Sequence, residues 1–210
     1  AAKSALEEKL GRKFTIPSMN LRCATFDEAR IVFKKAMEKK VGAFQIEIAP
    51  TEVAYTGQNF KEFAASVLAG AMAAGYTGPV FLKLDHMSIN PNKYYKEDAE
   101  AEIQRVFGII KEAIDAGFYA IDIDTSVLEA NPEEVNDPVE QQRDNFIASA
   151  KLIEMTRAYA IEKGVDVAIG VEVGEVGEAH ITEDHIRAFL ENLKSILASR
   201  SQEAGWNIAM

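Results

Sequence analysis

The sequence alternates five times between a short apolar run, typical of a β-strand, and a longer segment with helical periodicity. The expected strands are residues 14–20, 43–49, 80–85, 118–124 and 165–173. The expected helices are residues 25–40, 59–74, 96–116, 139–163 and 182–198. Because a helix follows each strand, the strands are expected to run parallel and to be joined by right-handed crossovers.

Local signals support these boundaries. Thr25 and Glu28 form a T-x-x-E pattern, which predicts a capping box at the start of the first helix. Glycines at positions 75, 117 and 164 are placed to end later helices. The strand candidates are nearly all apolar, which favours a sheet covered on both faces. Residues 206–210 resemble the approach to a sixth strand.

Two architectures fit this pattern: an open, doubly wound sheet and a (β/α)₈ barrel. No G-x-G-x-x-G follows the first strand, which disfavours a dinucleotide-binding sheet. A full barrel needs about 250 residues, and this chain has 210. We therefore expect an α/β fold in which residues 1–210 form a single partial barrel domain. It would supply about the first five β/α units of a TIM barrel, without the C-terminal strands.

Composition excludes several classes of function. The net charge of −10 argues against nucleic acid or an anionic membrane as the main partner. No apolar run approaches the ~20 residues of a membrane span. Cys23 is the only cysteine, so no intrachain disulfide can form, and a cytoplasmic location is expected. Cys23 itself is expected to be a small buried side chain.

Acidic and imidazole groups gather at the ends of the expected strands. They are Glu47, Asp85, His86, Asp122, Asp124, Glu172, Glu175 and Glu178. In a barrel the carboxyl ends of the strands meet on one face, which holds the active site. Groups far apart in the sequence are therefore expected to share one pocket.

The chemistry of such a pocket points to a metal ion. Burying several carboxylates with an imidazole is costly unless another charge offsets them, and a divalent cation does so. One histidine with two or three carboxylates suits zinc, or zinc with an alkaline-earth ion. A carboxylate left free beside a metal-polarised carbonyl can remove a proton from the adjacent carbon. The residue set therefore favours metal-assisted enolate chemistry.

Each feature also has a simpler interpretation. Asp85 and His86 could be an ordinary loop pair, and Asp124 could cap a turn through Thr125 and Ser126. Residues 172–178 could be a glycine-rich turn with an acidic exterior. His185 lies in an expected helix and is predicted to sit on the surface or to pack against a neighbour. The common location at successive strand ends is what favours a shared site.

These same segments resemble the class II ketose-bisphosphate aldolases. FLKLDHMS (residues 81–88) resembles the family's strand-end L-D-H, which implies that Asp85 is a general acid/base and His86 a zinc ligand. YAIDIDTS (residues 119–126) is similar to the family's I-D-x-S, which implies that Asp124 is a ligand at a second metal position. IPSMNLR (residues 16–22) resembles the opening strand, which implies that Asn20 binds substrate.

The stretch IGVEVGEVGE (residues 169–178) is similar to the family's V-E-x-E-L-G-x-x-G-G. The match implies that Glu175 and Glu172 belong to the metal-binding set, and we expect Glu178 to act as a second catalytic carboxylate. The spacing departs from the family, because it is E-x-x-E here, and Glu178 replaces the second glycine of a pair. The family also draws two zinc-binding histidines from later strands, which residues 1–210 do not contain.

The resemblance implies a lyase that cleaves a phosphorylated ketose of the fructose 1,6-bisphosphate type in a reversible aldol reaction. The expected cofactor is Zn²⁺, with a second divalent or monovalent cation as an option, and the expected assembly is a homo-oligomer. Two alternatives remain open: a non-catalytic barrel subunit or scaffold, and a sugar-phosphate isomerase or epimerase. Zinc content separates the aldolase from the scaffold, and product identity separates it from the isomerase. The open edges of a partial barrel would also favour association.

Overall fold

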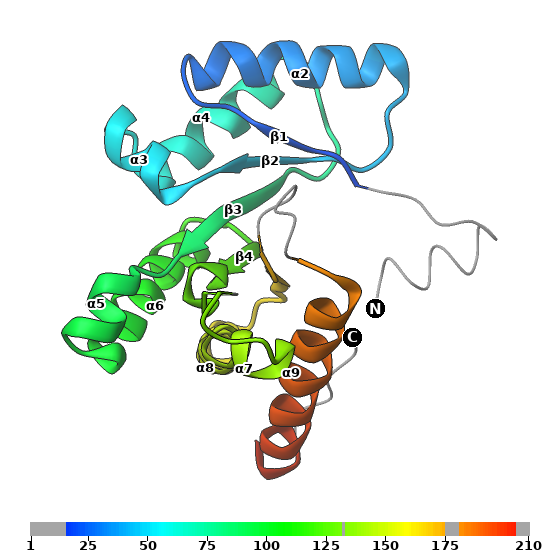
Figure 1. The fold of residues 1–210 in the computed structure, drawn as a ribbon. Coiled ribbons are helices and arrows are strands. Elements are labelled where there is room, and N and C mark those ends of the chain that lie inside the picture. Colours follow the sequence, from blue (N-terminus) through cyan, green and yellow to red (C-terminus); the bar gives the residue numbers. More distant parts are fainter. Residues whose placement is uncertain (1–15, 132, 175–180, 205–210) are drawn as a thin grey trace.

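The computed structural model describes residues 16–131, 133–174 and 181–204. Five parallel strands form one sheet in the order β1-β2-β3-β4-β5 (Figure 1). They are β1 (Ser18–Asn20), β2 (Gln45–Ile48), β3 (Phe81–Ser88), β4 (Ala120–Asp124) and β5 (Ala168–Val171). Strands adjacent in the chain are adjacent in the sheet, whereas a doubly wound sheet reverses its order at one point. The expected fold class, five units of a (β/α)₈ barrel, is confirmed.

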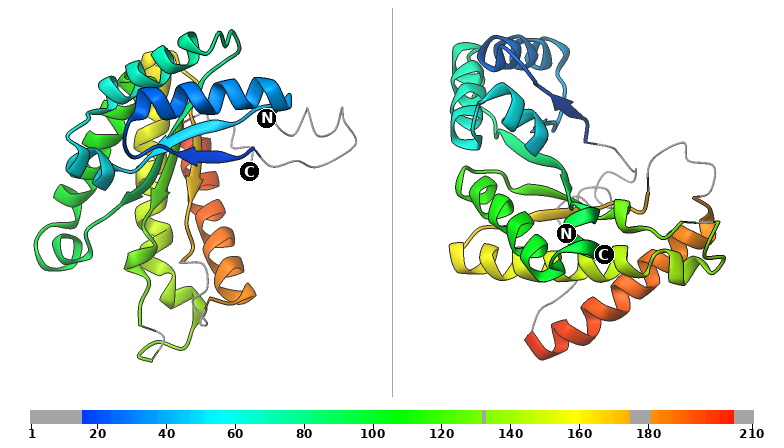
Figure 2. Two further views of the ribbon diagram at one scale, coloured as in Figure 1. Left: turned by 90° about the horizontal axis from the view of Figure 1, so that it is seen from above. Right: turned by 60° about the vertical axis from the view of Figure 1, so that its left-hand side comes forward.

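Helices follow every strand and line the outer side of the curved sheet (Figures 1 and 2). The long ones are α2 (Thr25–Lys39), α4 (Phe60–Ala73), α6 (Ala99–Asp115), α8 (Arg143–Lys163) and α9 (Glu183–Ala204). Shorter helices are α3 (Pro50–Thr56), α5 (Pro91–Lys96) and α7 (Pro138–Gln141), with a 3₁₀ turn at Ser126–Leu128. Within the described residues, no helix combines the length and apolar character required to span a membrane.

The two faces of the sheet differ sharply in polarity. Outward side chains of the central strands are apolar and buried: Ile46, Ile48, Leu82, Leu84, Ile121 and Ile123. Inward side chains alternate with them and are mostly polar: Glu47, Lys83, Asp85, Asp122 and Asp124. The strands are thus apolar mainly on the outer face, and the expected cover of the sheet on both faces stays a prediction. Among the described residues, helices pack against the outer face, and successive side chains of a strand point to opposite faces of the sheet.

The helices cover the outer face with the expected apolar stripes. In α6 these are Ile103, Val106, Ile110 and Ile114, all buried, with Phe107 partly buried beside them. Helices α2 and α4 pack closely at Gly70, where an added Cβ would lie 2.7 Å from the Phe26 carbonyl oxygen. Only glycine leaves room for this approach.

Helix α4 begins where the sequence predicts, whereas α2 begins without its predicted cap. Asn59 caps α4 by accepting a hydrogen bond from the Glu62 amide at 3.0 Å. The predicted capping box at Thr25 does not form. The cap position is Ala24, in the left-handed region with a φ of 46°, and the Thr25 hydroxyl instead donates to Gln58 Oε1 at 2.7 Å. The Thr25 side chain, predicted to cap α2, is thus engaged in a tertiary hydrogen bond instead.

Glu102, a buried residue of α6, is expected to stabilise the folded protein by an amount that depends on pH. Its carboxylate accepts hydrogen bonds from Asn90 N and from Arg105 Nε, both at 2.7 Å. The hydrogen bond from Arg105 lowers the pKa of Glu102, against the opposing effect of burial. A lowered folded-state pKa means that the stabilisation is present at neutral pH and is lost as the pH falls below about 4.

We expect Glu102→Gln to lower the free energy of unfolding by about 2 kcal/mol at pH 7. Urea unfolding at several pH values should show this difference shrinking towards acidic pH, because Glu102 of the parent protein becomes neutral there. The control is Glu100→Gln, an exposed carboxylate on the same helix, which should change stability little. A pH-independent loss in Glu102→Gln would contradict the assignment.

Candidate metal and catalytic site

Three side chains converge where β3, β4 and β5 end. They are His86, Asp124 and Glu172, and each offers a ligand atom within 4.8 Å of those of the other two. His86 Nδ1 lies 3.1 Å from Glu172 Oε1 and 3.8 Å from Asp124 Oδ2. One imidazole nitrogen with two carboxylate oxygens is a donor set that zinc and related divalent cations accept. The residues present therefore fit a divalent metal.

A β-bulge in β3 brings His86 to this cluster. In the pairing with β4, Leu84 lies opposite Ile121 and Met87 opposite Ile123, so two residues of β3 stand against one of β4. The extra residue is accommodated at His86, whose φ of 46° lies in the left-handed region. Bulges redirect side chains and are common beside active sites. Here the bulge directs both Asp85 and His86 to the inner side while Met87 stays buried on the outer side.

Asp124 is held in place through both of its carboxylate oxygens. Oδ1 accepts from the backbone N–H and the hydroxyl of Ser126 at 3.1 Å and 2.6 Å. Oδ2 accepts from the Ser88 hydroxyl at 2.9 Å and is also the atom nearest His86. The turn-capping interpretation of Asp124 and its place in the cluster are therefore compatible, because different oxygens serve the two roles.

Lys83 is a central residue of the inner face that the sequence analysis did not single out. Its ammonium donates to Asp85 and lies 3.3 Å from Glu47 Oε2 and 3.2 Å from Asp122 Oδ2. Burial lowers the pKa of Lys83, but the hydrogen bond to Asp85 and the neighbouring negative charges outweigh it, so the net shift is upward. The sequence signal was available, because residues two apart on a strand share a face and Lys83 precedes Asp85 by two.

The electrostatics of the cluster show an excess of negative charge. Burial, and after it the charge of Asp124, raise the pKa of Glu172 to about 7. Burial by itself lowers the pKa of His86, but Asp85, Glu172 and Asp124 raise it overall. Burial also raises the pKa of Asp122. Burial and neighbouring carboxylates together thus favour the protonated form of Glu172.

The other predicted site residues lie elsewhere or outside the described chain. Asn20 donates to Glu52 Oε2 at 2.7 Å and accepts from Arg22 Nε at 3.0 Å. These contacts place it in a polar group between β1 and α3. Glu175 and Glu178 lie outside the described residues, so their roles stay predictions.

His185 packs against a neighbouring helix, which is one of the two positions expected for it. It is buried in α9. Its Nε2 bonds to Gln141 Oε1, and its Nδ1 lies 3.2 Å from the Thr182 amide nitrogen. Its contacts therefore join α9 to α7, and they account for it without a catalytic role.

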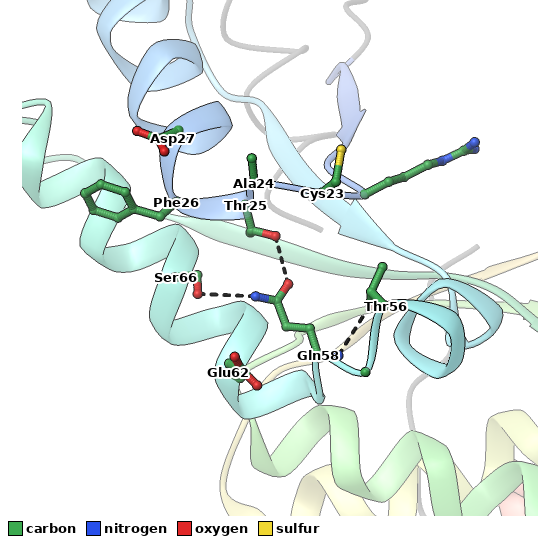
Figure 3. A pocket seen from close by; sticks show the side chains of 11 residues that line it. Cys23, Ala24, Thr25, Phe26, Asp27, Thr56, Gln58, Glu62 and Ser66 are labelled. Atoms are coloured by element: carbon green, nitrogen blue, oxygen red, sulfur yellow. Dashed lines mark hydrogen bonds between the residues drawn. The ribbon is translucent and has the colours of Figure 1, made fainter.

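A separate cavity of about 530 Å³ lies between the beginnings of α2 and α4 (Figure 3). Thr25, Gln58 and Ser66 are joined by hydrogen bonds along its wall. None of the three clustered ligand residues lines it. Cys23 opens onto this cavity and is exposed, so the expectation of a buried cysteine is wrong. It lies in the loop between β1 and α2.

The inner-face ion pairs lead to a stability prediction. Lys83→Met would leave Glu47, Asp85 and Asp122 without their shared cation, so we expect a loss of about 3 kcal/mol in unfolding free energy at pH 7. The loss should become smaller towards acidic pH, because burial raises the pKa of Asp122 and its protonation removes one of the charges that Lys83 offsets. Chemical denaturation of the exposed control Lys35→Met should show a change within about 0.5 kcal/mol. Equal effects of the two substitutions would rule out the charge-compensating role.

Comparison with solved structures agrees with the barrel architecture. A protein from Sinorhizobium meliloti 1021, described as a probable tagatose 6-phosphate kinase, superposes with a TM-score of 0.55 and 23% sequence identity. The match covers 90% of this chain and 47% of that one, so the chain spans about half of the length of that protein. A protein from Burkholderia cenocepacia J2315, assigned as a phosphonomutase, gives a TM-score of 0.48 at 18% identity, covering 94% and 70% of the two chains.

Sequence comparison identifies the family. No curated protein matches the sequence. One family model does match, and it covers residues 42–202, a span that includes β2 to β5 and every clustered side chain described above. Because the match covers most of the 210 residues, the chain belongs to the family described as D-tagatose-1,6-bisphosphate aldolase subunit GatZ/KbaZ-like.

Proposed function

We propose that this protein takes part in the metal-dependent aldol cleavage of a phosphorylated ketose. The observation that carries the proposal is the convergence of His86, Asp124 and Glu172 beside Asp85, at the strand ends where barrel enzymes place their active sites. The family is related to class II aldolases and acts in sugar-phosphate chemistry. Its description names D-tagatose 1,6-bisphosphate, which we take as the first substrate to test, with fructose 1,6-bisphosphate as the second.

In this proposal His86, Asp124 and Glu172 would hold a divalent cation, with Zn²⁺ as the first candidate. Such an ion supplies Lewis acidity, which polarises a carbonyl and stabilises the negative charge that develops during bond cleavage. Glu172 must lose its proton to bind the ion, because its pKa is raised to about 7. Glu175 would add a further carboxylate, as the resemblance implies.

Asp85 is the proposed general acid/base. One of its oxygens receives the Lys83 hydrogen bond, and the other lies 3.5 Å from His86 Nε2. The Lys83 contact places a positive charge beside the carboxylate and fixes its direction, as a positioned proton acceptor requires. Asp85 would take the proton of the substrate hydroxyl that becomes a carbonyl as the carbon–carbon bond breaks. Glu178 stays a candidate for the second proton transfer.

A second candidate function is a non-catalytic subunit. The family is described as an aldolase subunit, which favours assembly with a further chain. In this case the polar inner face would support a partner that carries the chemistry. The two proposals differ in whether purified protein cleaves substrate without a partner.

The first measurement is elemental analysis of the purified full-length protein, with its intact mass. We expect close to one zinc per chain, and we expect Asp124→Asn to lower the zinc content severalfold because it removes one ligand charge. The control Asp115→Asn alters an exposed aspartate that pairs with Lys163 and should retain zinc. Absence of zinc from the parent protein, even after incubation with the ion, would reject a zinc-dependent role.

A second prediction concerns catalysis. Asp85→Asn should lower kcat for ketose-bisphosphate cleavage by about 10²- to 10⁴-fold, because the general base is lost, while zinc content is unchanged. Coupled assays of aldehyde release with both bisphosphates would measure this. Zinc-loaded parent protein that cleaves neither substrate would favour the non-catalytic subunit over the enzyme.

A further inference from the structure

A buried hydrogen-bond network lies directly behind the candidate metal ligands. Its members are Thr125, Gln142, Asn145 and Ser149, and none of them has measurable solvent exposure. Thr125 follows Asp124 at the end of β4, while the other three come from the start of α8 and the residue before it. The Thr125 hydroxyl lies 2.6 Å from Asn145 Oδ1 and 2.7 Å from Ser149 Oγ. The network is therefore anchored next to one ligand.

The same network reaches the second ligand through main-chain contacts. The Asn145 amide nitrogen lies 3.2 Å from the carbonyl oxygen of Glu172 and 3.3 Å from that of Val173. The Gln142 amide donates to the Val173 carbonyl at 3.2 Å, and the Gln142 oxygen accepts from Asn145 at 2.9 Å. Asn145 thus contacts Thr125, the neighbour of Asp124, and the main chain of Glu172 itself.

The sheet itself does not fix the separation of these ligands. The last paired residues of β4 and β5 are Ile123 and Val171, so Glu172 lies one residue beyond the ladder. The Asp124 and Glu172 carboxylates repel each other, and this repulsion favours a wider separation in the absence of a cation. Contacts outside the ladder are needed to hold Glu172 near Asp124.

We infer that Asn145 is a positioning residue that sets the separation of Asp124 and Glu172 and thereby the affinity of the site for a divalent cation. The inference rests on the proposed function, because it assumes that these carboxylates bind a metal. Burying amide groups costs free energy, and apolar side chains of the same volume would fill this space without that cost. Packing alone therefore does not account for the network. Partners that orient metal ligands typically change metal affinity by about 10- to 100-fold when removed.

The test uses the full-length protein and the affinity for zinc, measured by competition with a chromogenic chelator. Asn145→Leu keeps the side-chain volume, removes the amide donor and adds no charge. We expect its zinc Kd to rise by about 10- to 100-fold, and the visible spectrum of the Co²⁺-loaded protein to shift. The matched control is Thr156→Val, which removes another buried hydroxyl from α8, one with no hydrogen-bond partner among the described residues. Its zinc Kd should equal that of the parent protein.

The outcomes separate positioning from general stabilisation. A folded Asn145→Leu protein with the parent zinc Kd, whatever its melting temperature, would overturn the inference while leaving the proposed function intact. If Asn145→Leu does not fold, Gln142→Met serves instead, because it removes the amide that donates to Val173. A zinc Kd that is severalfold higher in that variant supports the inference, and an unchanged zinc Kd overturns it. A parent protein that binds no zinc would overturn the proposed function, and the inference with it.

Discussion

The structure depends on how negative charge is compensated on the inner face of the sheet. Glu47, Asp85, Asp122, Asp124 and Glu172 all approach this surface at or beside the ends of four strands. Bringing carboxylates together in a partly buried place is unfavourable unless cations or hydrogen-bond donors offset them. Burial of the apolar outer face drives folding. Once the sheet has formed, the carboxylates of its inner face need positive charges or hydrogen-bond donors beside them.

The compensation divides the inner face into two regions. Lys83 satisfies the first region internally by contacting Glu47, Asp85 and Asp122. In the second region, with Asp124 and Glu172, the neighbouring basic side chain among the described residues is the half-exposed imidazole of His86. Burial, and after it the charge of Asp124, raises the pKa of Glu172 to about 7. A charged side chain thus completes one region, while the other groups the three side chains that we propose as metal ligands.

The cavity and the carboxylate cluster occupy different parts of the barrel. The cavity lies between the starts of α2 and α4, whereas the cluster lies at the ends of β3 to β5. A search for the active site based on cavities alone would therefore find this surface and not the carboxylate cluster. The family match includes the strands that carry the cluster, and it supports a role in sugar-phosphate chemistry.

The sequence by itself determined the repeated strand–helix unit and the location of its polar groups, because helical and strand periodicities are local properties. It placed Asp85, His86, Asp124 and Glu172 at strand ends, and parallel topology then brought these ends to the same side of the sheet. It could not reveal the bulge, since an extra residue in β3 is defined only by its pairing with β4. Likewise, only the tertiary structure engaged Asn20 with Glu52, gave the Thr25 hydroxyl to Gln58, and joined Asn145 to two strand ends. These side chains have several potential partners in the sequence, and packing decided which of them came within hydrogen-bonding distance.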